Sequence, residues 1–129
     1  MAYRKGSIEI QTDTRFKDNN KFDCRPCHPA VLPIASGYPA GEVYYLLVTS
    51  NVGRYLVFED QYYSLADVWR EAGLTKPSLI NLQRIYKTSK PGNVVAGLPP
   101  KVYKDMIRKL KAYQDKNPDP LYEEIRAYL

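Results

Sequence analysis

The hydrophobic period of this chain changes near Pro99, and that change limits the folds that the chain can form. Before Pro99 the apolar residues come in short runs typical of strands. After Pro99 they recur at intervals of three and four residues, which predicts a helix over residues 99–114. The apolar stripe of this helix is Val102, Tyr103, Met106, Ile107, Leu110 and Tyr113. Strands followed by helices predict an α+β domain.

The strand-like runs are short and are separated by turn residues. The strongest is 43–49, which is β-branched and aromatic throughout. Pro33 cannot donate to a strand ladder, so we expect it at an edge or a bulge of its strand. The other predicted strands are 7–10, 30–35, 55–59, 78–82 and 94–98, and the polar segment 11–23 is predicted as a loop. Five to seven such strands predict a strongly bent sheet or a partly open barrel over about residues 4–98.

Helix signals are found at two further places. Ser64 and Gly73 suit the two ends of a short helix over 64–72. Asp119 suits the cap of a last helix, with Pro120 at its first position. We therefore expect helices over about residues 99–129, and one domain over residues 1–129.

Composition limits the class of protein. The chain has 129 residues, of which 44% are apolar and 26% charged, as in an ordinary globular domain. No run of eighteen apolar residues occurs, and the first residues lack the apolar segment of a signal peptide. We expect a cytoplasmic protein without a membrane partner, with both cysteines as thiols. The net charge of +5 permits an anionic partner without requiring one.

Residues Cys24-Arg25-Pro26-Cys27-His28 match the pattern of covalent haem attachment. Haem attachment requires export and a second axial ligand, which this chain does not offer. Zinc would lack a fourth ligand, and a redox pair would require a helix N-terminus. The sequence therefore favours two partly buried thiols with no metal and no cofactor, although a small thiol- or metal-linked protein remains a third hypothesis.

A basic segment between Ala72 and Lys104 contains no acidic residue. Its cations are Lys76, Arg84, Lys87, Lys90, Lys101 and Lys104, and Tyr86 and Tyr103 lie among them. Cations with interleaved aromatic rings suit a phosphate backbone with unpaired bases. The alternative is an ordinary solvated surface.

Three residues stand out as candidates for chemistry on phosphate. Arg25 lies just before the strand 30–35, where a guanidinium can face a phosphate through two hydrogen bonds. Thr49 and Ser50 end the strongest strand with two hydroxyls, a placement that suits hydrogen bonding to a substrate oxygen. The alternative interpretations are a surface charge and a turn that ends the strand.

The order of these segments resembles the MazF/PemK (Kid) family of toxin endoribonucleases. The matching segments, in order, are Lys5-Gly6-Ser7-Ile8-Glu9-Ile10, Arg25-Pro26 before an apolar strand, Leu47-Val48-Thr49-Ser50, Gly73-Leu74 before the Ser78 strand, and Gly97-Leu98 before the long helix. The resemblance covers about residues 4–114. It depends on the order of all five segments along the chain rather than on any one motif.

The resemblance implies an SH3-like barrel that forms a homodimer and holds single-stranded RNA in a groove, paired with an antitoxin that is a protein or an RNA. It implies a metal-independent reaction, in which the ribose 2′-hydroxyl attacks the adjacent phosphate and leaves a 2′,3′-cyclic phosphate and a 5′-hydroxyl. Arg25 and Thr49 are then the catalytic pair, with Ser50 beside them. His28 is a candidate acid–base group, but in an extended chain it faces away from Arg25.

The chain also departs from the family pattern. Its first loop carries Arg15 and Lys17 in place of the usual Gly- and Gln-containing stretch, and we expect both to bind RNA together with Lys76, Arg84 and Lys87. The segment from Ser50 to Ser78 is longer than usual, and 119–129 is an addition. A second hypothesis is therefore a non-catalytic barrel of the same fold, which binds nucleic acid or a protein target such as a topoisomerase.

Overall fold

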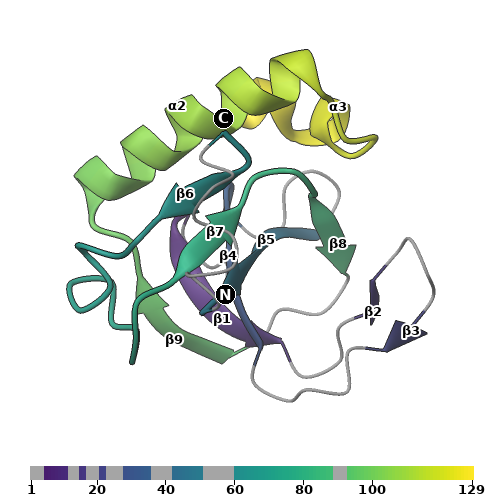
Figure 1. Cartoon of the computed structure of the whole chain (residues 1–129). Helices are drawn as coiled ribbons and strands as arrows, with labels where there is room; N and C mark the ends of the chain where they lie inside the picture. Colours follow the sequence, from purple (N-terminus) through teal and green to yellow (C-terminus); the bar gives the residue numbers. More distant parts are fainter. Residues whose placement is uncertain are drawn as a thin grey trace.

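The protein is a single α+β structure in which one antiparallel sheet packs against C-terminal helices. The computed structural model describes residues 5–11, 15–16, 21–22, 28–35, 42–50, 60–88 and 93–129 (Figure 1). Its strands are β1 (Ser7–Gln11), β2 (Arg15–Phe16), β3 (Lys21–Phe22), β4 (His28–Val31), β5 (Val43–Thr49), β6 (Tyr62–Ser64), β7 (Leu79–Asn81), β8 (Tyr86–Thr88) and β9 (Asn93–Gly97). Its helices are α2 (Pro100–Lys116), α3 (Tyr122–Ile125) and the 3-10 helix η1 (Arg126–Tyr128). The predicted α+β class with C-terminal helices is confirmed.

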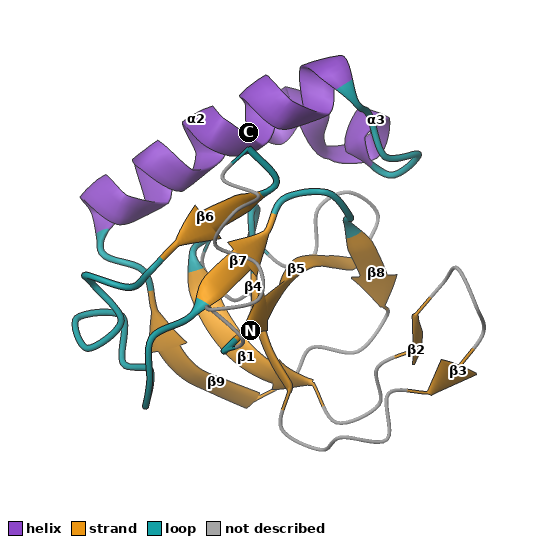
Figure 2. Ribbon diagram, in the orientation of Figure 1, coloured by secondary structure: helices purple, strands orange, loops and turns teal. Residues whose placement is uncertain are grey.

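Seven strands form the main sheet, in the order β6-β7-β5-β4-β1-β9, with β8 also paired to β5. Every pairing is antiparallel. The sheet is not closed, because β6 and β9 stand at the two ends of the strand order. β2 and β3 form a separate two-stranded ribbon (Figure 2).

β5 is the central strand, and it bends the sheet. One edge pairs with β4, and the other pairs with β7 near Thr49 and with β8 near Val43. On β5, only Leu46 and Leu47 separate the residues that pair with β7 from those that pair with β8. On the other side of the ladder, residues 81–85 separate the paired residues of β7 and β8. Extra residues on one strand disrupt the ladder and increase the local bend.

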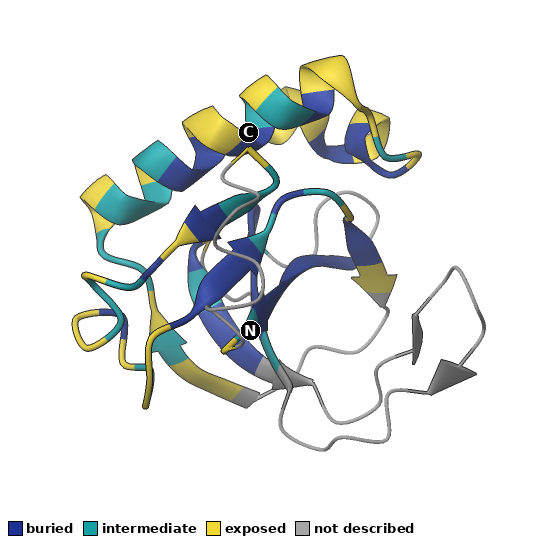
Figure 3. Ribbon diagram, viewed as in Figure 1, coloured by how far each residue is buried: buried dark blue, intermediate teal, exposed yellow. Residues whose placement is uncertain are grey.

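The main hydrophobic core lies between one face of the sheet and the helices. Leu46 and Val48 on this face are buried with Met106 and Leu110 of α2. Figure 3 shows that the buried residues of α2 lie toward the sheet and the exposed residues away from it. The amphipathic stripe of α2 is thus confirmed, with the addition of a buried Gln114. Gln114 Nε2 donates to the Leu82 carbonyl at 2.7 Å, and its Oε1 accepts from Asp119 N at 2.7 Å.

The sequence predicted Asp119 as the cap of the C-terminal helix, but α3 has Leu121 at its N-cap and no side-chain cap bond. Asp119 instead closes the turn before the helix. Its Oδ1 accepts from Leu121 N at 2.9 Å, and its carbonyl accepts from Tyr122 N at 2.9 Å. Such bonds satisfy amides that the first helical turn leaves without a partner. They fix the position where α3 turns back toward the sheet beside β8 (Figure 1).

Several predicted elements differ from the structure. β4 is His28–Val31 instead of the predicted 30–35, and it includes Pro29, which lies opposite Ile10. Leu32 still bonds to the backbone of β1, and Pro33, which has no N–H to donate, lies beyond the strand. The predicted loop 11–23 includes the last residue of β1 and the ribbon of β2 and β3. β8 was not predicted, and the predicted strand 55–59 lies outside the described residues.

The predicted helix 64–72 is wrong, although its end was predicted correctly. Ser64 belongs to β6. Leu65 N donates to Ser78 O at 2.8 Å, and this bond holds the segment to the residue just before β7. The residues that follow form successive turns. They end at Gly73, whose φ is +83°. Leu74 N donates to Trp69 O and Gly73 N to Arg70 O, the paired bonds of a Schellman motif.

No described helix is both long enough and apolar enough to cross a membrane.

Candidate functional site

The strand ends near Thr49 bring polar residues from several strands together. Thr49 is the last residue of β5 and lies opposite Leu79 of β7, which in turn lies opposite Ser64 of β6. In an antiparallel sheet, opposite residues share a face and have Cβ atoms about 5 Å apart. Thr49 and Ser64 therefore lie in one cross-strand row, on either side of Leu79.

The same row continues into β4 and β1. The pairing of β4 with β5 ends at Ala30, which lies opposite Leu47. Two further residues in the same register would bring the backbone of His28 opposite Thr49. His28 lies opposite Gln11. The row thus runs through positions Ser64, Leu79, Thr49, His28 and Gln11, and we call it the Thr49 row.

The Thr49 row belongs to the sheet face that the helices do not cover. Val48 is part of the main core beneath α2, and successive side chains in a strand point to opposite faces. Thr49 therefore shares its face with Leu47 and Tyr45. Thr49 is half-buried and Ser50 is exposed, so this end of β5 is accessible from outside.

Glu9 is buried on the same face, and the sequence did not predict this. It lies opposite Ala30, in the row next to the Thr49 row, and is 0% exposed. The polar and apolar alternation of 7–10 is typical of a half-buried strand, in which the polar residues face solvent. The strand is in fact covered on both faces at this residue, and a single sequence carries no signal for that. A carboxylate in such a position is costly unless it is paired, so it marks the face as chemically specialised.

Of the predicted RNA-binding residues, Lys76 lies at this end of the sheet. It precedes Leu79 by three residues, and Leu79 is opposite Thr49. Its carbonyl accepts from Ser78 Oγ at 2.9 Å, and its side chain is exposed. One cation of the basic segment is therefore close in sequence to the strand residue that pairs with Thr49.

Lys87 lies elsewhere and has a structural contact. It is opposite Tyr44, five residues before Thr49 on β5, which is about 17 Å along the strand. Lys87 Nζ lies 3.1 Å from Glu124 Oε1, and the same oxygen accepts from Tyr44 Oη at 2.8 Å. Burial, with the Glu124 carboxylate next, raises the pKa of Tyr44. Lys87 thus connects β8 to α3 and is not brought together with Thr49.

Arg84 lies in the bulge between β7 and β8, and it is exposed. It hydrogen-bonds to Tyr86, whose ring stacks on that of Tyr45 with the centroids 5.5 Å apart. Burial raises the pKa of Tyr86, and the nearby guanidinium opposes that rise. The face that carries Thr49 therefore also carries a stacked tyrosine pair, toward the other end of β5.

Other predicted site residues lie outside the described residues or are described by their backbone only. Arg25, Lys17, Cys24 and Cys27 lie outside. Arg15 is in β2 and His28 in β4, and only their backbone is described. Within the described part of the chain, no group of three or more His, Cys, Asp or Glu residues is arranged to hold a metal ion.

The chemistry that this end of the sheet offers is hydrogen bonding and charge. Thr49 and Ser50 supply hydroxyl donors, Lys76 supplies an exposed cation, and Glu9 supplies a buried carboxylate one row away. Hydroxyl and ammonium donors suit the oxygens of a phosphate. No protein-family model matches this chain, and no curated protein matches it.

Proposed function

We propose that the protein is a metal-independent endoribonuclease for single-stranded RNA, with its catalytic site at the Thr49 end of the sheet. The observation that carries the proposal is the antiparallel pairing of β4 with β5, in which Ala30 lies opposite Leu47, so that His28 and Thr49 are each two residues beyond a paired residue at the same end. Arg25 is three residues before His28, so chain connectivity keeps their Cα atoms within about 11 Å. The open, bent antiparallel sheet with a C-terminal helix supports an SH3-like barrel of the MazF/PemK kind.

The proposed reaction is an in-line transesterification. The ribose 2′-oxygen forms a bond to phosphorus while the bond from phosphorus to the 5′-oxygen breaks. The 2′-hydroxyl proton passes to a base, and the leaving 5′-oxygen gains a proton. The products are a 2′,3′-cyclic phosphate and a 5′-hydroxyl, and neither an oxidant nor a metal ion is required.

Each residue of the site has a role in this proposal. Arg25 stabilises the charge that develops on the phosphoryl oxygens, because a guanidinium is too basic to remove a proton at neutral pH. Thr49 donates to a non-bridging oxygen, and Ser50 and Lys76 bind the adjoining phosphate. His28 is the acid–base candidate. Glu9 is a positioning residue, whose buried carboxyl group can accept a hydrogen bond from a polar group on this face.

The resemblance to the MazF/PemK family also suggests a biological role and an oligomeric state. We propose that the enzyme is the toxin of a toxin–antitoxin pair, that it acts as a homodimer in the cytoplasm, and that the antitoxin blocks access to the Thr49 row. Sedimentation of the purified protein tests the dimer, and inhibition of cleavage by a co-expressed neighbouring gene product tests the antitoxin.

The test of the chemistry is incubation with a long single-stranded RNA in EDTA, followed by analysis of the new ends. We expect discrete cleavage with cyclic phosphate termini, lowered at least about 100-fold by Arg25→Ala and by Thr49→Ala. Ser7→Ala is a matched control, because Ser7 is a half-buried strand hydroxyl at the other end of the sheet. Cys24→Ser/Cys27→Ser is the control for thiol chemistry.

Two results would overturn the proposal. Loss of cleavage in EDTA would favour a metal-linked protein. Intact RNA that nevertheless binds would favour the non-catalytic barrel.

A further inference from the structure

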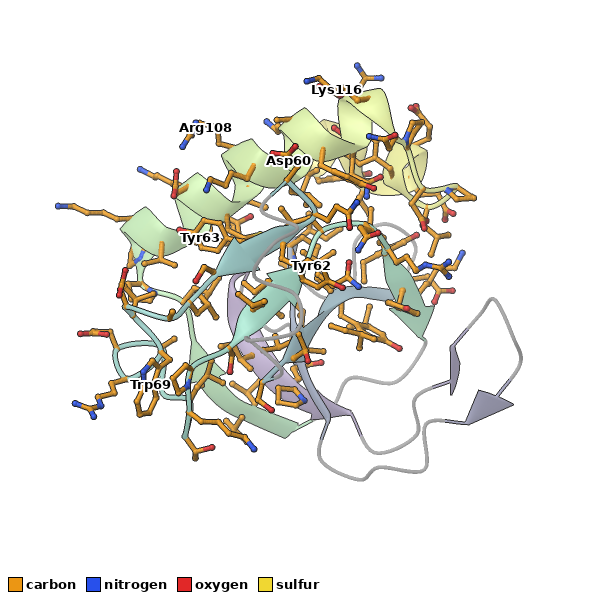
Figure 4. All side chains as sticks on the ribbon, in the orientation of Figure 1. Asp60, Tyr62, Tyr63, Trp69, Arg108 and Lys116 are labelled. Atoms are coloured by element: carbon orange, nitrogen blue, oxygen red, sulfur yellow. The ribbon has the colours of Figure 1, made fainter. Side chains whose placement is uncertain are left out.

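The solvent face of α2 carries most of the net charge of the protein. The helix has six basic residues against two acidic ones, an excess of four, and the excess of the whole chain is five. The basic residues are Lys101, Lys104, Arg108, Lys109, Lys111 and Lys116. Figure 4 shows Arg108 and Lys116 pointing away from the sheet. This surface lies on the helix side of the sheet, whereas the Thr49 row is on the opposite face.

The two acidic residues of α2 accept hydrogen bonds from tyrosines of neighbouring elements. Asp105 accepts from Tyr63 Oη at 2.9 Å and is paired with Arg108. Asp115 accepts from Tyr122 Oη at 3.0 Å. These contacts fasten the helix to β6 and α3, and they leave the lysines as the dominant charge on its outer side.

Three of the lysines form a stripe along the helix. Lys101, Lys104 and Lys111 are spaced by three and seven residues, which places them within about 80° of one another around the axis and about 15 Å along it. None of the three forms an ion pair with a described residue. A row of unneutralised cations on one rigid element suits a polyanion whose charges also repeat at intervals of several ångströms.

A pocket adjoins the C-terminal half of α2. It lies between the helix and the residues that lead into β6, and its volume is about 450 Å³. It is lined by the side chains of Lys109, Tyr113 and Lys116 on the helix, with Asp60, Gln61 and Asn117 around them. This volume is in the usual range for small-ligand sites. A half-buried tyrosine between two lysines, with amides nearby, can stack a base and hydrogen-bond its edge.

We propose that the outer face of α2, together with this pocket, is a binding surface for single-stranded RNA. The lysine stripe holds consecutive phosphates on one flank of α2. Tyr113 lies at least about 120° around the helix axis from each of the three lysines, so the strand crosses the outer face of α2 before one base enters the pocket. Protein interfaces generally have an apolar core, but the large hydrophobic residues that are exposed in the described part of the chain are Val94, Val95 and Tyr128, none of them on α2. A face without an apolar anchor suits a partner that is bound through its phosphates.

Because the α2 face and the Thr49 row lie on opposite sides of the sheet, a short RNA reaches only one of them. A long RNA can contact both, and α2 then raises the affinity of the enzyme for long substrates without touching the scissile phosphate. This consequence for cleavage rests on the proposed function, whereas the binding itself does not.

The binding test uses the full chain with Thr49→Ala, so that RNA remains intact. Affinity for a fluorescent 30-nucleotide RNA is measured by anisotropy as a function of salt. We expect Lys101→Gln/Lys104→Gln/Lys111→Gln to weaken binding at least about tenfold and to lower the salt slope by about 2. The control is Lys5→Gln/Arg70→Gln/Arg126→Gln, which removes the same charge from exposed residues outside the lysine stripe and should cost less than about threefold. Lys5 Nζ lies over the Tyr103 ring of α2, 5.5 Å from its centroid.

A second variant tests the pocket. Tyr113→Leu should weaken binding of the RNA several-fold but leave the binding of inorganic polyphosphate, which has no bases, unchanged. Equal losses in the two triple variants would overturn the proposal, as would the absence of RNA binding at low salt. Retention of RNA binding by the α2 triple variant together with loss of binding to polyglutamate would also overturn it, because the face would then be a site for an acidic protein.

The cleavage test separates the two proposals. In the active enzyme the α2 triple variant should raise KM for a long RNA with kcat unchanged, and it should leave cleavage of a five-nucleotide substrate unchanged. A protein that binds RNA through α2 but cleaves nothing would sink the proposed nuclease and leave the α2 surface standing. If the enzyme cleaves long RNA equally well with and without the three lysines, the α2 surface is overturned and the proposed nuclease stands.

Discussion

On one face of the sheet, Leu46 and Val48 of β5 pack against Met106 and Leu110 of α2. On the other face, the alternate residues of the same strand are Leu47, in a smaller cluster with Ala30, Tyr45 and Tyr86, and the half-buried Thr49. The first face is mainly apolar, with Gln114 as a buried polar residue that is hydrogen-bonded. The second combines a small apolar cluster with a buried carboxyl group and with the hydroxyls of Thr49 and Ser64.

The comparison shows how a small domain separates stability from chemistry. Because side chains alternate along a strand, adjacent residues of β5 serve different faces and can vary independently. The helix-covered face supplies most of the apolar burial that holds the fold. The other face can then keep polar groups such as Glu9, which would be too costly in the main core.

The largest expected effect compares two buried leucines, one from each face. Leu110→Ala should lower the free energy of unfolding by about 3–5 kcal/mol, because it leaves a cavity in the main core under α2. Leu47→Ala, in the smaller cluster, should cost about 2 kcal/mol. Urea unfolding of both variants measures the difference, and equal losses would show that the two faces contribute alike.

Gly73→Ala tests the packing at the rim of the main core. The φ of Gly73 is +83°, and an added Cβ would lie 2.9 Å from the Cβ of Ala96 on β9. Both the left-handed backbone and the close contact disfavour alanine, so we expect a loss of about 2–3 kcal/mol. The double variant Gly73→Ala/Ala96→Gly removes the contact and should recover part of this loss. No recovery would mean that the backbone conformation accounts for the whole effect.

The comparison of faces also explains what the sequence could and could not predict. The alternation and β-branching of 43–49 and the three- and four-residue spacing of α2 are local signals, and both elements formed as predicted. The stop at Gly73 is a local signal too, and Asp119 forms a local turn, although α3 begins at Tyr122 and not at the predicted Pro120. β8 and the burial of Glu9 depend on which distant strands cover them, and no local pattern records that.

The same limit applies to the candidate site. Thr49 and Ser50 were found because hydroxyls at a strand end are visible in the sequence. Their alignment with His28 and Ser64 follows from the pairing of strands that are far apart in the chain. The role of Arg25 stays a prediction, and so do those of Arg15 and Lys17.

Two neighbouring residues of β5 give the sharpest test of the separation between faces. Val48→Ala should cost about 1.5–3 kcal/mol of stability, because Val48 is 2% exposed in the main core. Thr49→Ala should change stability by less than about 1 kcal/mol while it abolishes most of the cleavage. Unfolding and cleavage are measured on both variants. A Thr49→Ala protein as unstable as Val48→Ala would assign Thr49 to the fold instead of the site.

The smallest expected effect is a pH dependence of the helix-covered face. Tyr63 Oη donates to Asp105 Oδ2 at 2.9 Å, and burial, with that hydrogen bond next, raises the pKa of Tyr63 to about 12. Burial also raises the pKa of Tyr103, whose hydroxyl donates to Pro33 O at 2.5 Å, to about 12. Both shifts favour the protonated form in the folded state. Their contribution to stability is therefore fully present below the unfolded pKa of about 10 and is lost as pH rises through 12.

Tyr63→Phe/Tyr103→Phe should accordingly cost about 1 kcal/mol per hydroxyl at pH 7 and make the decline in stability above pH 10 shallower than in the parent. Tyr128→Phe is the control, because Tyr128 is half exposed at the C-terminal end of the chain. Unfolding free energies from pH 7 to 11.5, with tyrosinate absorbance followed in parallel, give both quantities. If the double variant declines as steeply as the parent, the alkaline decline comes from other buried tyrosines. Burial also raises the pKa of Tyr44 and Tyr122 in the main core and of Tyr86 on the other face.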